Sequence, residues 1–248
     1  MTDSSPAQQP PSGDDAVTDE HARLQAQNLE LATLAGGLAH EIRNPLSTMR
    51  MNLELLSEDL EDEGTPGTRR MQTRVDKLKN ECLNLEGVLN AFLQFARAGQ
   101  LNLVTCSLND EVHDFLSFIR PQAEDTGVEL RPHLDANLPA VAIDTALLRQ
   151  VLANLGRNAL QAMPNGGTLE FITRLRDDHV ALEVIDTGEG MNAATIEKMF
   201  QAFFSTRSGG SGLGLPTVRR IIEAHGGTIE CESEPGRGTR FTILIPAG

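Results

Sequence analysis

Apolar residues recur at steps of three and four along two stretches of the first hundred residues, a spacing typical of amphipathic helices. In the first stretch the apolar positions are Leu31, Leu34, Leu38, Ile42, Leu46, Met49, Leu53, Leu56 and Leu60. The segment EDEGTPGT at 61–68 interrupts this pattern with glycine and proline. The second stretch restores it, in heptad-like steps, as Met71, Val75, Leu78, Cys82, Leu85, Leu89, Phe92 and Ala96. The pattern predicts two long helices joined by a short turn, an antiparallel hairpin over residues 21–99.

A lone hairpin cannot cover both of its apolar stripes. We therefore expect a second copy of the chain to pair with it and form a dimeric four-helix bundle. Residues 1–20 are mostly Pro, Ser, Asp and Gln and have little to bury. This composition predicts a disordered tail ahead of the hairpin.

After Gly99 the hydrophobic pattern changes to short strand-like runs separated by helical stretches. The runs are LNLV, VELRPHL, TLEFITRL, VALEVID, GTIECESE and TRFTILIP, and the helical stretches lie near 108–125, 144–163, 193–201 and 213–225. This order predicts a mixed sheet with helices on one face, in a second domain over residues 100–248. The expected fold class is α+β, with the helical hairpin followed by an α/β sandwich.

Charge and cysteine content limit the partners and metal sites that the chain can be expected to have. The chain carries 21 basic and 35 acidic residues, a formal net charge of −14, which disfavours nucleic acid as a partner. No apolar run approaches the roughly 18 residues of a membrane span, and the amino terminus lacks the apolar core of a signal peptide. The isolated Cys82, Cys106 and Cys231 show no metal-ligand spacing. We expect a cytoplasmic protein with buried free thiols.

The motif HEIRNP places a histidine on the polar side of the first helix. At 100° per residue, His40 points about 200° away from each flanking stripe residue. The preceding Gly36–Gly37 pair leaves the space over its imidazole uncovered. Glu41 is adjacent, and Asn44 follows one turn later on the same face. A structural histidine would lie on the apolar stripe, so we interpret His40 as a presented nucleophile or base.

Polar and glycine-rich motifs mark the second domain. Asn154 and Asn158 share one helix face and are suitable Mg²⁺ ligands, although two solvent-facing asparagines would give the same pattern. Asp186 ends an expected strand, and Gly188 and Gly190 follow it in a turn where the backbone can approach a ligand.

A second glycine-rich segment, SGGSGLGL, opens the helix that begins near Leu213. Free backbone N–H groups and the positive end of the helix dipole converge at such a start, which predicts an anion site. The later segment EPGRGTRF, taken alone, is typical of a hairpin turn.

Taken in order, these segments resemble the sensor histidine kinases of two-component systems from about residue 30 to the end. HEIRNP is similar to the phosphoacceptor box of that family, NLGRNALQAM to its N-box, and DTGEGM to its first glycine box. FQAFFSTR is similar to its F-box, and GGSGLGL and GRGTRF are similar to its later glycine boxes. The F-box and glycine-box sequences are most like those of the soluble nitrogen-regulation branch. The resemblance implies a dimerisation and phosphotransfer hairpin, followed by an ATP-binding sandwich of the Bergerat type.

The resemblance also implies roles for individual residues, with ATP and Mg²⁺ as the bound groups. His40 would be phosphorylated, Glu41 would be its acid–base partner, and Asn44 would position water for dephosphorylation of the partner. Asn158 would ligate Mg²⁺ with Asn154 close by, and Asp186 would accept the adenine amino group. The remaining residues expected at the nucleotide are Gly188, Gly190, Arg207, Gly210, Gly212, Leu213, Gly214 and Thr239.

The chain departs from the family at two places. The F-box usually ends in Thr-Thr-Lys, where this chain has Ser205, Thr206 and Arg207, and we expect Arg207 to grip the γ-phosphate in place of the lysine. Arg157 stands where the family often has an apolar or small residue, and the sequence assigns it no role.

The sequence therefore predicts a cytoplasmic, homodimeric protein-histidine kinase that transfers phosphate to an aspartate of a response regulator receiver domain. One alternative is an ATPase of the same superfamily without phosphohistidine. Such enzymes activate water with a glutamate four residues before the Mg²⁺-ligating asparagine, a position held here by Asn154. A second alternative is a scaffold or phosphatase-only regulator that keeps the fold, against which the intact motifs argue.

Overall fold

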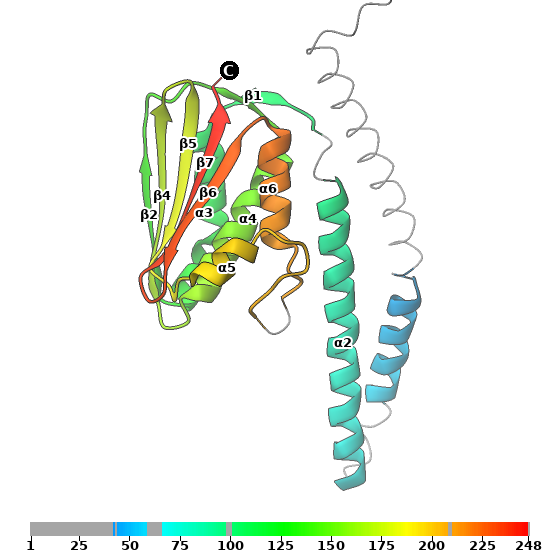
Figure 1. The fold of residues 1–248 in the computed structure, drawn as a ribbon. Helices are drawn as coiled ribbons and strands as arrows, with labels where there is room; N and C mark the ends of the chain where they lie inside the picture. Colours follow the sequence, from blue (N-terminus) through cyan, green and yellow to red (C-terminus); the bar gives the residue numbers. More distant parts are fainter. Residues whose placement is uncertain (1–41, 43, 59–65, 98–100, 208–209, 248) are drawn as a thin grey trace, which may run out of the picture.

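The computed structural model describes residues 42, 44–58, 66–97, 101–207 and 210–247. Figure 1 shows two helices that stand beside an α/β domain. The predicted tail, His40 and Glu41 lie outside the described residues. Within the described ranges, no helix combines the length and the apolar character that crossing a bilayer requires.

The predicted antiparallel hairpin is confirmed. Residues 44–58 are helical, and helix α2 spans Pro66–Arg97. Near the turn, the Gln72 side chain donates a hydrogen bond to Ser57 Oγ. Farther from the turn, Arg50 Nε lies 3.8 Å from Glu86 Oε1. Contacts that join earlier residues of one helix to later residues of the other establish that the two run in opposite directions.

The apolar seam of α2 divides into two halves. Every seventh residue, namely Val75, Cys82, Leu89 and Ala96, is buried. The alternate seam residues Met71, Leu78 and Leu85 are 57%, 54% and 49% exposed. One half therefore packs within the chain, and the other half is largely exposed.

The central sheet has five strands in the order β2–β4–β5–β7–β6. They span Val128–Leu134 (β2), Gly167–Arg176 (β4), His179–Asp186 (β5), Thr228–Glu234 (β6) and Gly238–Pro246 (β7). β2 is parallel to β4, whereas the other pairs are antiparallel, so the predicted mixed sheet is confirmed. A separate antiparallel pair joins β1 (Val104–Cys106) to β3 (Val141–Ile143), and β3 was not predicted.

Three long helices cover one face of this sheet (Figure 1): α3 (Leu108–Asp125), α4 (Thr145–Ala162) and α6 (Gly214–Ala224). The short α5 spans Ala193–Lys198 and ends earlier than the sequence predicted. The core between helices and sheet includes Val112, Val151, Leu152, Leu182 and Ile243, all fully buried. This arrangement confirms the predicted α+β fold with an α/β sandwich as its second part. The three cysteines are free, but of the buried thiols that the sequence predicted only Cys82 is buried; Cys106 and Cys231 are partly exposed.

The amino end of α4 is tied to two other parts of the chain through Asp144. Its Oδ1 caps the helix by accepting the Leu147 N–H at 3.0 Å, and its Oδ2 accepts the Asn102 N–H at 2.9 Å. Its own N–H donates to His225 Nε2 at 2.9 Å. Because Asn102 follows α2 and His225 ends α6, one residue fixes where three segments meet.

The α/β domain also touches the hairpin directly. The guanidinium of Arg220 on α6 lies over the Phe95 ring of α2, 5.1 Å from its centroid. This cation–π contact holds the carboxyl-terminal end of α2 against α6.

Two helical glycines provide a matched test of this packing. A Cβ at Gly156 would lie 2.6 Å from Phe115 Cζ and 2.8 Å from Ile119 Cδ1, whereas one at Gly87 would meet nothing within 4 Å. We expect Gly156→Ala to destabilise the fold by about 1–3 kcal/mol through overpacking. Gly87→Ala should instead stabilise α2 by up to about 1 kcal/mol. Thermal melting of both variants measures the effect, and shifts of the same sign would contradict the described packing.

Candidate functional site

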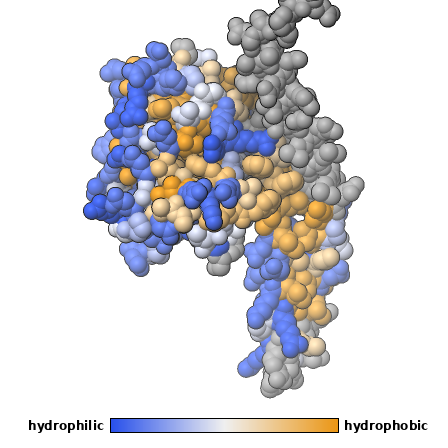
Figure 2. Space-filling view, in the orientation of Figure 1, coloured by the Kyte–Doolittle hydropathy of each residue, from blue (hydrophilic) through white to orange (hydrophobic). Residues whose placement is uncertain are grey.

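A cavity of about 1750 Å³ lies between α2 and the helical layer of the α/β domain. Its walls come from α2, α3, α4, the turn after β5 and the segment that leads into α6. Figure 2 shows apolar residues gathered across this side of the molecule, from the α/β domain to the hairpin, with hydrophilic residues among them. All the expected nucleotide residues except Gly188 line it: Asn154, Asn158, Asp186, Gly190, Arg207, Gly210, Gly212, Leu213, Gly214 and Thr239.

Asp186 lines the cavity and is only 6% exposed. Its Oδ1 accepts the Gly188 N–H at 2.8 Å, and the Thr239 backbone also hydrogen-bonds to this carboxylate. Burial raises the pKa of Asp186 above its usual value, and the two backbone hydrogen bonds oppose that rise without cancelling it. The site therefore holds a desolvated acceptor that would gain from a donor on a ligand.

The two glycines after β5 allow close packing of the turn, and one of them also borders the cavity. Gly188 is buried against α4, where a Cβ would lie 2.6 Å from the Ala162 carbonyl oxygen. Gly190 has φ +64, and a Cβ there would overlap the Glu234 carbonyl oxygen. Gly190 lines the cavity, whereas Gly188 holds the turn against the helix behind it.

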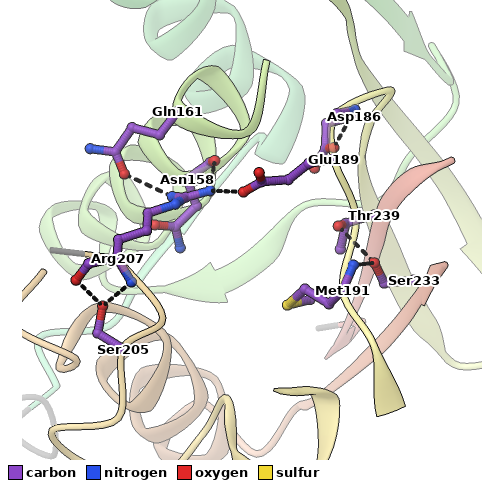
Figure 3. Close-up of polar contacts among 10 residues, drawn as sticks. Asn158, Gln161, Asp186, Glu189, Met191, Ser205, Arg207, Ser233 and Thr239 are labelled. Atoms are coloured by element: carbon purple, nitrogen blue, oxygen red, sulfur yellow. Dashed lines mark hydrogen bonds and ion pairs between the residues drawn. The ribbon is translucent and has the colours of Figure 1, made fainter. Parts of the chain in front are cut away.

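Ser233 supports this turn from β6, and sequence reasoning did not identify it. Its hydroxyl accepts the Met191 N–H at 2.8 Å (Figure 3) and donates to the Gly238 carbonyl at 2.9 Å. It also lies 3.0 Å from the Thr239 hydroxyl. No local pattern indicates this role, because the partners come from another strand, β7, and from the turn after β5.

The two asparagines of α4 differ in what they contact. Asn154 Nδ2 donates to the Gly214 carbonyl at 3.5 Å, which connects α4 to the first turn of α6. The half-buried Asn158 side-chain amide has no hydrogen-bond partner within the part of the chain that the structure describes. An unengaged amide oxygen is available to a Mg²⁺ ion. Asn158 is thus the better candidate ligand of the two, and its role as a metal ligand stays a prediction.

Arg207 reaches across the cavity to α4 and to the turn after β5 (Figure 3). Its guanidinium donates to Gln161 Oε1 at 2.8 Å and to Glu189 Oε1 at 3.4 Å. A third, longer bond of 3.5 Å reaches the Asn158 carbonyl. The Ser205 hydroxyl bridges the backbone N–H and carbonyl of Arg207, both at 3.1 Å. Sequence analysis did not identify Gln161 or Glu189 as site residues. Their positions could have indicated it, because Gln161 lies one helical turn after Asn158 and Glu189 lies between Gly188 and Gly190.

The start of α6 is open to an anion. Its first flanking residue, Leu213, makes no side-chain capping bond. Gly212 has φ +66 and packs so closely on the Phe203 backbone that a Cβ would overlap it. Gly210 and Gly214 also line the cavity, so uncapped N–H groups and the helix dipole face it.

The expected phosphoacceptor region is only partly described. His40 and Glu41 lie outside the described residues. Asn44 is exposed on the first helix, where its carbonyl accepts the Thr48 hydroxyl at 3.1 Å. The roles given to these three residues stay predictions.

Two family models match the chain in the order that the motifs suggested. Residues 30–101 match the His Kinase A (phospho-acceptor) domain, and residues 143–248 match the histidine kinase-, DNA gyrase B-, and HSP90-like ATPase. Among curated proteins, the chain is 34% identical to the sensor histidine kinase ZraS of Klebsiella oxytoca, over 87% of this chain and 46% of ZraS. It is 33% identical to the signal transduction histidine-protein kinase AtoS of Escherichia coli, over 92% of this chain and 37% of AtoS.

Solved structures of histidine kinases are also similar to the chain. Full-length ShkA in complex with AMPPNP is 28% identical with a TM-score of 0.70, covering 87% of this chain and 46% of that one. The histidine kinase ThkA in complex with the response regulator protein TrrA is 25% identical with a TM-score of 0.65, covering 93% and 66%. The chain spans about half the length of ZraS, 46%.

The raised pKa of Asp186 generates a prediction for the free protein. Because this carboxyl holds its proton more tightly in the folded state, its contribution to stability is present at low pH and is lost as pH rises through the folded pKa. Asp186→Asn keeps an acceptor for the same N–H groups but carries no charge. We expect it to melt at a higher temperature than the unsubstituted chain at pH 7, with the gap closing toward pH 4. A gap that widened on acidification would show that burial does not dominate at Asp186.

Proposed function

We propose that this chain, a member of the sensor histidine kinase family, transfers the γ-phosphoryl group of ATP to His40. The phosphoryl group then passes to an aspartate of a response regulator receiver domain. One observation carries the proposal: a buried carboxylate, an unengaged asparagine amide and an uncapped helix start all face one cavity beside the hairpin.

The cavity offers a place for each part of ATP. Asp186 would accept the adenine amino group, since a desolvated carboxylate binds an N–H donor strongly. The phosphates would lie at the start of α6, between Gly210 and Gly214. Asn158 would hold Mg²⁺, which neutralises charge on the phosphates. ShkA, the similar structure, was solved with AMPPNP, which supports nucleotide binding here.

The transfer itself requires a nucleophile and little other chemistry. The lone pair of His40 Nε2 forms a bond to the γ-phosphorus, while the bond from that phosphorus to the β–γ bridging oxygen breaks. ADP leaves with the electron pair. The proton on Nδ1 of the phosphorylated ring passes to Glu41, which leaves a neutral phosphoimidazole.

Hydrolysis of ATP by water is not promoted at this site. Asn154 occupies the position where related ATPases place a glutamate, and its amide cannot take a proton from water. Glu189, which also lines the cavity, is paired with Arg207 at 3.4 Å. The absence of a free carboxylate at Asn154 favours a kinase over an ATPase of the same superfamily.

Partner and assembly follow from the same proposal. ThkA, similar over 93% of this chain, was solved with a response regulator protein. A homodimer would cover the exposed half of the α2 seam.

Exposed Asn44 would position water when the kinase dephosphorylates its partner. The phosphotransfer hairpin would extend over residues 21–99 and the ATP-binding domain over 100–248; α2 ends at Arg97 and β1 begins at Val104. We place this acidic chain with free thiols in the cytoplasm.

Replacement of the acceptor should separate binding from transfer. His40→Gln is expected to abolish incorporation of acid-labile, alkali-stable phosphate from γ-labelled ATP. Its ATP affinity, measured by calorimetry, should equal that of the unsubstituted chain, because the nucleotide residues lie in the other domain. Undiminished labelling would show that another residue is the acceptor, and release of free phosphate alone by the unsubstituted chain would support an ATPase instead.

Replacement of the proposed metal ligand should affect binding of the metal–nucleotide complex. Asn158→Ala is expected to weaken Mg²⁺-dependent ATP binding at least tenfold while leaving the oligomeric state unchanged. Asn165→Ala, at an exposed asparagine outside the cavity, is the control. Equal affinities for the two variants in calorimetry with Mg²⁺ would remove Asn158 from the metal site.

A further inference from the structure

Arg157 is a cation with no ion-pair partner among the described residues, and it lines the cavity proposed to hold ATP. It is exposed on α4 and lines the same cavity as Asn154, Asn158 and Arg207. Within the described ranges it forms no ion pair and no hydrogen bond through its side chain. In a chain with 35 acidic residues, an unpaired guanidinium at this place calls for an explanation.

Most other arginines of the α/β domain have a carboxylate partner. These are Arg131, Arg149, Arg174, Arg207, Arg219, Arg237 and Arg240. Two of them, Arg149 and Arg207, also line the cavity, but Arg149 binds Glu111 at 2.8 Å and Arg207 binds Glu189. Arg157 is therefore the cavity cation whose charge and five donors are still available.

Arg157 lies on the face of α4 that lines the cavity. It lies three residues after Asn154, which places it roughly 60° around the helix from that side chain. Residues of α2 that include Asn84, Gly87 and Asn90 line the same cavity. A phosphoryl group that moves from a nucleotide in this cavity to the hairpin would therefore travel in a space that Arg157 also borders.

We propose that Arg157 is a catalytic residue, whose guanidinium binds the γ-phosphoryl oxygens during transfer to the histidine. The inference rests on the proposed kinase function and adds a residue to it. The transferring group carries its charge on three equatorial oxygens, and a planar guanidinium binds two of them at once. Arg207, which the sequence predicted to grip the γ-phosphate, is engaged with Glu189 at 3.4 Å and with Gln161 at 2.8 Å. Arg157 has no such partner among the described residues, so its guanidinium is available to the moving phosphoryl group.

Single-turnover autophosphorylation with γ-labelled ATP at saturating concentration tests the inference. Arg157→Gln should lower the rate about 100-fold, as loss of one preorganised donor does at comparable sites. Its ATP dissociation constant should stay within about twofold, because the contact forms in the transition state. Arg157→Lys should recover part of the rate. Arg120→Gln and Arg176→Gln, at arginines outside the cavity, should match the unsubstituted chain.

Three outcomes would overturn the inference. Arg157→Gln could label at the unsubstituted rate, or its ATP affinity could fall by the same factor as its rate, which would make Arg157 a ground-state ligand. The variant could also take up phosphate from ATP normally but fail to pass it to a receiver domain, which would make Arg157 a docking residue. Failure of the kinase proposal is distinct, since the unsubstituted chain would then take up no acid-labile phosphate.

Discussion

Helix α4 is the element on which the remaining geometry depends, because part of its surface is buried in the core and part lines the cavity. Leu152 and Leu155 are fully buried and pack into the core. Asn154 and Asn158 line the cavity. Core burial fixes the rotation of the helix, and the hydrogen bond from Asn154 to the Gly214 carbonyl supports it on the polar side. The Asp144 cap then fixes the position of the helix along its axis, because it bonds both Asn102 and His225.

The regular elements could be predicted from sequence because their signals are local. The strands at 128–134 and 239–246 and the helix at 108–125 follow directly from the spacing of their apolar residues. β3 was missed because three residues, Val141–Ile143, are too few to show a period. The halves of the α2 seam could not be told apart either. Val75 and Leu78 are equally apolar, and only the position of the first helix decides which one is buried.

The candidate site was predictable where a motif names its chemistry and not where the partner is distant in sequence. Asp186 and Asn158 stand out in their motifs and line the cavity. Ser233 could not be found, since its value depends on a register that brings β6 beside β7 and the turn after β5. The arginines show the same limit. Sequence identified Arg207 by its motif, but only the structure shows that Arg207 pairs with Glu189 and that Arg157 has no such partner among the residues it describes.

The cavity must also let its two walls separate, because the proposed acceptor lies on the hairpin and the donor on the other domain. One contact across the interface is Arg220 over Phe95, and such a pair contributes about 0.5–2 kcal/mol. That is small beside the burial that holds α4 in its domain, where each large core side chain contributes about 1.5–3 kcal/mol. Breaking that pair alone would therefore cost little beside unfolding the core around α4. The proposed transfer needs a nucleotide site that keeps its shape while its distance from the hairpin changes, and the buried core of the α/β domain supplies the first of these two requirements.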